Sequence, residues 1–80
     1  MVISMNNTAP RTLSTTEAGV SRSIYTLRPG AYIWHAGAYR LVTAVDGRTV
    51  RMGRYVLHSL NATTVEAAPL RAVFAARRAA

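Results

Sequence analysis

The sequence predicts a small, mainly β fold, in which four or five antiparallel strands form a barrel or a meander. Between residues 23 and 60, short β-favouring runs alternate with turn signals, whereas the preceding stretch is polar and lacks a sustained period. We therefore expect an extended polar N-terminal arm over residues 1–20, a β domain over residues 21–68, and a short C-terminal helix or last strand with a basic tail over residues 69–80.

The arm is crowded with Ser, Thr and Asn. Within it, the segment STTE at residues 14–17 matches a capping box, in which Ser and a Glu three residues later satisfy free N–H groups at a helix start. A short helical turn is therefore expected there, and Gly19 would soon end it.

The β domain consists of runs that each lead into a turn signal. The runs are SIYTL (23–27), AYIWH (31–35), AYRLVTAV (38–45), RTVRM (48–52) and RYVLHSL (54–60). The strongest turn signal is the Asp-Gly pair at residues 46–47, because Asp-Gly between alternating segments is typical of two-residue hairpin loops. A meander of this length fits a small SH3-like barrel or an open antiparallel sheet.

The last segment can be interpreted in two ways. Pro69 suits the first position of a helix, and Leu70, Val73 and Phe74 recur at i, i+3 and i+4, on one helical face. A strand stays open as an alternative, because Leu70, Ala72 and Phe74 also alternate.

The hairpin loop at residues 46–47 sets which side chains share a face. If the Asp-Gly pair forms the loop, Leu41 faces Met52 on one side of the sheet, and Val42 faces Arg51 on the other. The first side is the more apolar, and we expect it to face the core.

A tight turn at residues 36–37 extends the same register back along the chain. It pairs Trp34 with Tyr39 and Tyr32 with Leu41, so that all three aromatic rings join the expected core face. Base stacking needs exposed rings, and this register leaves two for it: Tyr25 and Tyr55.

The opposite face would carry a basic strip, with Arg40 and Arg51 on adjacent strands and His35 near a hairpin tip. Such a strip can neutralise phosphates or meet carboxylates. The candidate residues for binding a protein partner or a nucleic acid are Ile33, His35, Arg40, Arg48, Arg51 and Arg54.

The net charge narrows the class of partner. The chain carries a formal charge of +7, from ten basic residues that are all Arg and three acidic residues, Glu17, Asp46 and Glu66. This balance favours nucleic acid, anionic surfaces or acidic proteins as partners. A chain of 80 residues without Cys has no disulfide to support a core worth about 3–5 kcal/mol, so a partner or self-association is expected to help.

Several other classes are not expected. No apolar run approaches the roughly 18 residues of a membrane span, and the N-terminus lacks the pattern of a signal peptide. We expect no membrane partner, and a cytoplasmic location or one within a virus particle. His35, His58 and three scattered carboxylates form no catalytic or metal-binding motif, so that no enzyme activity, metal or cofactor is expected.

One motif supplies an alternative. Residues 13–27, LSTTEAGVSRSIYTL, resemble the helix-turn-helix opening of small excisionase-type DNA-binding proteins, and residues 50–54, VRMGR, are similar to the wing of that family. The resemblance implies a recognition helix, on or beside which Ser21, Arg22, Ser23 and Tyr25 would lie. It also implies a wing that would carry Arg51 and Arg54. A long strand-like stretch separates the two pieces where the family has a brief link.

Together these features predict a non-enzymatic structural or adaptor subunit of a larger assembly, such as a small decoration or minor capsid-type protein of a virus particle. It would bind protein neighbours through its arm and basic sheet face, as a homo- or hetero-oligomer. The alternative is an Arg-rich DNA- or RNA-binding regulatory protein.

Overall fold

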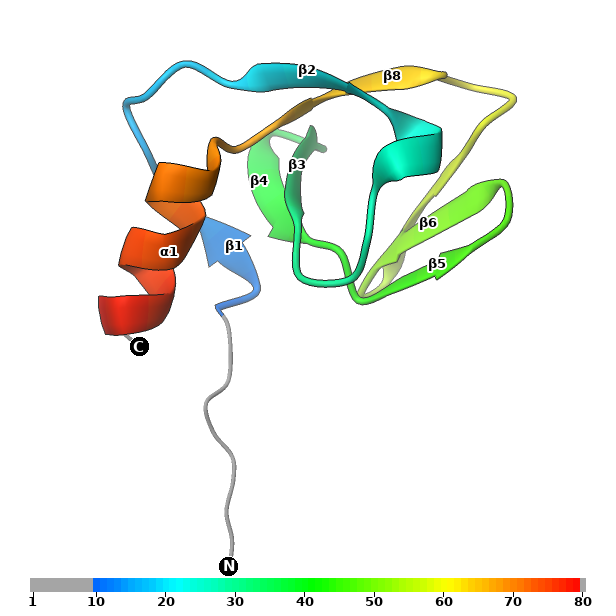
Figure 1. Cartoon of the computed structure of the whole chain (residues 1–80). Coiled ribbons are helices and arrows are strands. Elements are labelled where there is room, and N and C mark those ends of the chain that lie inside the picture. The colour runs from blue at the N-terminus through cyan, green and yellow to red at the C-terminus, as the bar shows by residue number, and fades with distance from the viewer. Residues whose placement is uncertain (1–9, 80) are drawn as a thin grey trace, which may run out of the picture.

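The computed structural model describes residues 10–79 and confirms a mainly β fold with two antiparallel sheets and a C-terminal helix (Figure 1). The five-stranded sheet contains, in spatial order, β1 (Thr12–Leu13), β4 (Ala38–Leu41), β3 (Tyr32–His35), β8 (Thr64–Ala67) and β2 (Val20–Ser23). The three-stranded sheet contains β5 (Ala44–Asp46), β6 (Thr49–Met52) and β7 (Tyr55–His58). A 3₁₀ turn, η2 (Ile24–Thr26), follows β2, and the helix is α1 (Leu70–Ala79).

The two sheets share no hydrogen-bonded strands, so the expected barrel is not closed and an SH3-like arrangement is not confirmed. Strands β3 and β4 stand between α1 on one side and β5 and β6 on the other (Figure 1). The last segment is helical, which decides between the two alternatives for it. Residues 1–9 of the expected arm lie outside the described residues.

The β3–β4 hairpin has the predicted register. Tyr32 pairs with Leu41 and Trp34 with Tyr39, and a two-residue turn separates the strands. A type I′ turn needs positive φ at both central residues, and here φ is 51° at Ala36 and 82° at Gly37. Alanine tolerates this left-handed conformation poorly, so the turn depends on support from its surroundings.

The predicted strand over residues 38–45 is broken in two. The N–H of Val42 donates to the carbonyl of Ala31 in the five-stranded sheet (2.8 Å), whereas the N–H of Thr43 donates to the carbonyl of Arg51 in the three-stranded sheet (2.8 Å). The chain therefore leaves one sheet for the other between these two residues. Side-chain alternation cannot be extended across this break.

The β5–β6 register also differs from the prediction. Val45 pairs with Val50 and Asp46 with Thr49, so that the loop is Gly47-Arg48 rather than the Asp-Gly pair. Gly47 has φ of 57°, as the first central residue of a type II′ turn requires. The prediction was right that Gly47 lies in the loop, but it placed Gly47 second in the loop instead of first.

Strand β3 is buried on both faces, which the prediction of one core face did not include. Ile33 is 0% exposed and packs in the cluster between the sheets, with Val42 and Val50 among others. Tyr32 is 1% exposed and packs on the helix side, in the cluster that contains Val73. Ile33, expected on an open face, is therefore unavailable to a partner.

Trp34 shares the helix-side face with Tyr32 and Tyr39, but it is 51% exposed. Its ring meets that of Tyr39 edge to face at 5.1 Å between centroids. The register was right and the expected burial of Trp34 was wrong, because the helix-side cluster covers Tyr32 and Tyr39 and stops short of this ring.

The described part of the arm is attached to the domain. Leu13 in β1 pairs with Tyr39 in β4, and the hydroxyl of Tyr32 donates to the carbonyl of Pro10 at 2.5 Å. The expected capping box forms no helix: the hydroxyl of Thr15 accepts a hydrogen bond from the N–H of Glu17 at 3.1 Å.

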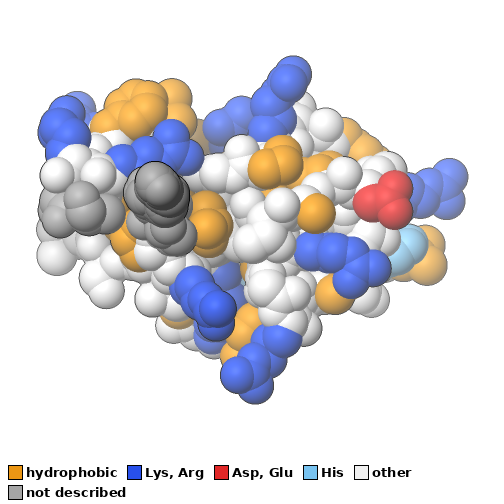
Figure 2. All heavy atoms as spheres, turned by 90° about the horizontal axis from the view of Figure 1, so that it is seen from below, with side chains coloured by type: hydrophobic (Ala, Val, Ile, Leu, Met, Phe, Trp, Pro, Cys, Tyr) orange, Lys and Arg blue, Asp and Glu red, His pale blue; other side chains and the backbone are white. Residues whose placement is uncertain are grey.

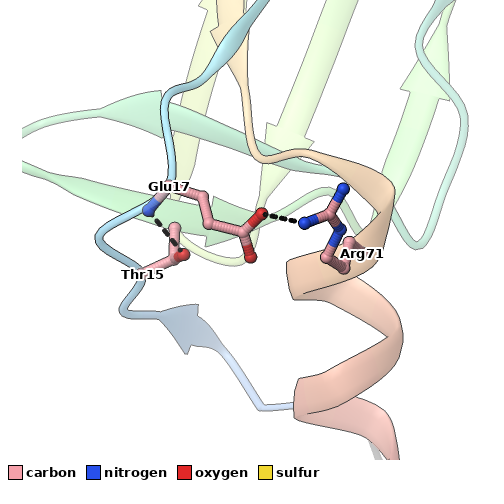
Figure 3. Close-up of polar contacts among 3 residues, drawn as sticks. All are labelled: Thr15, Glu17 and Arg71. Carbon is pink, nitrogen blue, oxygen red and sulfur yellow. Dashed lines mark hydrogen bonds and ion pairs between the residues drawn. The ribbon is translucent and has the colours of Figure 1, made fainter.

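Glu17 in turn lies 3.7 Å from the guanidinium of Arg71 in α1 (Figure 3). This ion pair is exposed and contributes little to stability. Residues 13–27, which resemble a helix-turn-helix, form the end of β1, an irregular link, β2 and η2. They therefore contain no α-helix, and the structural part of that resemblance is wrong.

A buried tyrosine, Tyr39, links the two strands that flank β3, which are β4 and β8. The hydroxyl of Tyr39 donates a hydrogen bond to the Glu66 carboxylate, and a side chain at Gly19 would collide with this pair. This hydrogen bond, which Tyr39 donates to Glu66, raises the pKa of Tyr39 above its ordinary 10.0, and burial and the negative charge of Glu66 raise it further.

The difference in burial between Ile33 and its neighbour Trp34 predicts that truncating these two side chains costs unequal amounts of stability. We expect Ile33→Val to destabilise the fold by about 0.5–1.5 kcal/mol and Ile33→Ala by about 2–5 kcal/mol, since each leaves a cavity between the sheets. Trp34→Ala, at a half-exposed ring, should cost less than Ile33→Ala. Urea unfolding followed by circular dichroism measures all three; a larger loss at Trp34 than at Ile33 would contradict the difference in burial between these two side chains.

The Tyr39–Glu66 hydrogen bond predicts a loss of stability in alkali. Because the pKa of Tyr39 is raised on folding, the folded state binds its proton more tightly than the unfolded state. The resulting stabilisation is complete below pH 10 and disappears as the pH rises through the folded-state pKa. Unfolding free energies measured between pH 8 and 11 should fall less steeply in Tyr39→Phe than in the wild type or in the control Tyr25→Phe, at an exposed ring. Equal slopes in all three proteins would refute the coupling.

Candidate functional site

Three arginines line one hollow beside β1 and the β6–β7 turn. The cavity has a volume of about 600 Å³, and the side chains that matter for its chemistry are Arg11, Thr12, Arg40, Thr43, Arg54 and Tyr55. We call it the arginine groove. No Asp or Glu lines it. Its arginines come from three separate segments: the arm, strand β4 and the β6–β7 turn.

Arg40 is held rigidly in the groove. Its Nε donates to the carbonyl of His35 at 2.8 Å and its Nη2 to the carbonyl of Ala36 at 2.9 Å. The guanidinium also lies 4.0 Å above the centroid of the Tyr55 ring, and His35 contacts the same ring edge to face at 5.8 Å. Since a guanidinium has five N–H donors, these two bonds leave donors for another acceptor.

The groove is not neutralised by neighbouring acids. Among residues 10–79, Glu17 with Arg71 forms the one ion pair within 4.0 Å, and neither residue lines the groove. Figure 2 shows blue arginine side chains spread over this face of the molecule and one red acidic patch near an edge. The groove therefore presents three arginines, none of which has a carboxylate of the described residues within 4.0 Å.

The six predicted binding residues do not form one surface. Arg40 and Arg54 line the arginine groove, and His35 supports it through Tyr55. Arg51 is exposed, on the side of the three-stranded sheet opposite the buried Val50 and Met52. Arg48 is exposed in the β5–β6 loop, and Ile33 is completely buried.

The sequence analysis missed Arg11 and Thr12 in this site. Their place depends on β1, where Thr12 pairs with Arg40 in a neighbour distant in sequence. A strand of two residues is too short to show a period. The one signal in the sequence that could have indicated this part of the site is the isolated Arg11 just before the strand.

A second hollow, of about 310 Å³, lies at the start of α1. Its lining includes the apolar side chains of Leu70, Val73 and Phe74 and the guanidinium groups of Arg22, Arg28 and Arg77. We call it the helix pocket. It too has no acidic residue in its lining.

Two features define the chemistry of the helix pocket. Leu70 is 62% exposed and Phe74 is 50% exposed, so the expected apolar face of α1 is only partly covered, mainly at Val73. Arg77 Nη2 donates to the carbonyl of Gly30 at 2.9 Å and connects the helix to the loop before β3. Burial raises the pKa of Tyr32 in the pocket wall, and the charge of Arg77 partly opposes this.

Neither hollow has the composition of a metal site. Within residues 10–79, no three His, Cys, Asp or Glu side chains come together as a metal-binding group. In the same part of the chain, no helix has the length and apolarity to span a membrane. No family model, curated protein sequence or solved structure matches this chain.

Proposed function

We propose that this protein is a non-enzymatic adaptor or structural subunit of a larger assembly, which binds an acidic segment of a protein neighbour at the helix pocket. The observation that carries the proposal is the exposure of Leu70 and Phe74 beside three arginines. An apolar surface rimmed by polar or charged groups is typical of protein interaction sites.

The apolar part of this surface supplies binding energy. Leu70 and Phe74 are four positions apart and lie on the same helical face. Complete burial of such a side chain is worth about 1.5–3 kcal/mol, and half or more of each surface is still in contact with water. A partner side chain inserted into the pocket would cover both.

The charged part selects the partner. Arg22, Arg28 and Arg77 surround the apolar surface without a neighbouring carboxylate in the pocket wall. A second copy of the chain also carries a charge of +7 and would be repelled. The charge thus favours a different protein, with an apolar residue flanked by Asp or Glu.

A pair of labelled acidic peptides tests this proposal by fluorescence anisotropy: one has a central Phe and the other has Ala in its place. The wild type should bind the Phe peptide at least about fivefold more tightly, which corresponds to about 1 kcal/mol of apolar contact. Leu70→Ala/Phe74→Ala should remove this preference.

The matched control is Val56→Ala/Leu60→Ala, which truncates two other exposed apolar side chains and should keep the preference. Thermal unfolding of both double variants checks that each is folded. The proposal is wrong if the wild type binds both peptides equally, or if the helix variant still prefers the Phe peptide.

A second candidate function is binding of single-stranded nucleic acid. It is favoured by the exposure of Trp34 and Tyr25, at 51% and 62%, in a strongly basic chain. Exposed aromatic rings near arginines stack on bases, for about 1–3 kcal/mol per base.

Because Trp34 is the single tryptophan, its emission reports directly on stacking. Titration with an oligothymidylate should quench the emission, with an apparent affinity that falls steeply between 50 and 200 mM salt. Arg40→Ala/Arg51→Ala should weaken this binding. An emission unchanged by the oligonucleotide, together with no binding at 50 mM salt, would eliminate this candidate.

A further inference from the structure

We infer that the arginine groove is a binding site for a small phosphate-rich anion, of the class that carries two or three linked phosphates. This site is separate from the helix pocket, and the inference does not depend on the proposed adaptor function. It rests on the number and the origin of the arginines that line the groove and on the rigidity of one of them, Arg40.

The first argument is the uncompensated charge. Arg11, Arg40 and Arg54 line one cavity, and no carboxylate of the described residues lies within 4.0 Å of any of them. Three like charges around one hollow repel one another unless an anion lies among them. A chain of linked phosphates carries enough negative charge to neutralise all three.

The second argument is the rigidity of Arg40. Its two bonds to backbone carbonyls and its stacking on Tyr55 fix the guanidinium plane before any ligand arrives. A fixed fork loses little conformational freedom on binding an oxyanion, and arginine suits phosphate because two parallel N–H groups can contact two oxygens.

The third argument concerns size and shape. A volume of about 600 Å³ lies in the middle of the range for small-molecule pockets. The arginines reach the groove from three segments of the chain and surround a single hollow. This arrangement favours a compact anion over an extended nucleic-acid strand, whose phosphates need a basic track.

Isothermal titration calorimetry of the full chain with sodium tripolyphosphate tests the inference. Binding should be detected at 50 mM salt and should be at least about tenfold tighter than that of citrate, which carries a smaller negative charge, on carboxylates. Arg54→Gln and Arg11→Gln should each weaken tripolyphosphate binding about tenfold or more.

Arg48→Gln is the matched control, since it removes the same charge from an exposed arginine outside the groove. It should change the affinity less than about twofold. Arg40→Lys keeps the charge but cannot reproduce the fork, and it should weaken binding as strongly as the removal of a charge does. Thermal unfolding of each variant confirms that it is folded.

Three results would overturn the inference. Equal weakening by Arg48→Gln and Arg54→Gln would mean that only the overall charge matters. Equal affinity for citrate would mean that the groove does not select phosphate. Binding of an oligothymidylate without binding of tripolyphosphate would assign the groove to a nucleic-acid backbone. Loss of acidic-peptide binding in the helix-pocket variants would leave the tripolyphosphate result unchanged, so the two proposals can fail separately.

Discussion

The first half of strand β3 is buried from both sides, and this double burial joins the two hydrophobic clusters of the fold. Ile33 closes the space between the two sheets, and its neighbour Tyr32 closes the space on the helix side. In a chain of 80 residues one strand thus belongs to two hydrophobic clusters. Because the same strand contributes to both clusters, a chain too short for one large core can still cover much of its apolar surface.

The two hollows lie where additional segments attach to the β3–β4 hairpin. The helix pocket lies where α1 returns toward the loop before β3, with Arg77 bonded to Gly30. The arginine groove lies where the arm adds β1 to β4 and the β6–β7 turn approaches Arg40. The same hairpin therefore contributes to both hollows, the partly apolar helix pocket and the basic arginine groove.

Local signals in the sequence were sufficient to predict the β3–β4 hairpin. The Ala36-Gly37 turn and the alternation around it determine which residues are opposite, and the predicted pairs of Trp34 with Tyr39 and Tyr32 with Leu41 are confirmed. The helical alternative for the last segment is confirmed as well. Local signals could not show that β3 is covered twice, because alternation separates two faces without showing what packs on each.

The errors have the same physical origin. The break at Val42 and Thr43 depends on hydrogen bonds to Ala31 and Arg51, which belong to different sheets. Arg11 enters the groove only because β1 pairs with a strand far along the chain. Non-local contacts of this kind leave no periodic trace in a short segment. Of the candidate residues, Arg40 and Arg54 line the arginine groove, Arg48 and Arg51 lie outside it, and Ile33 is buried.

The left-handed alanine at the tip of the β3–β4 hairpin gives Arg40 two roles. Its guanidinium bonds the carbonyls of His35 and Ala36 and so stabilises a turn that alanine alone disfavours. The same group lines the arginine groove. Any group that draws the guanidinium of Arg40 away from these two carbonyls would therefore also leave the left-handed alanine without that support.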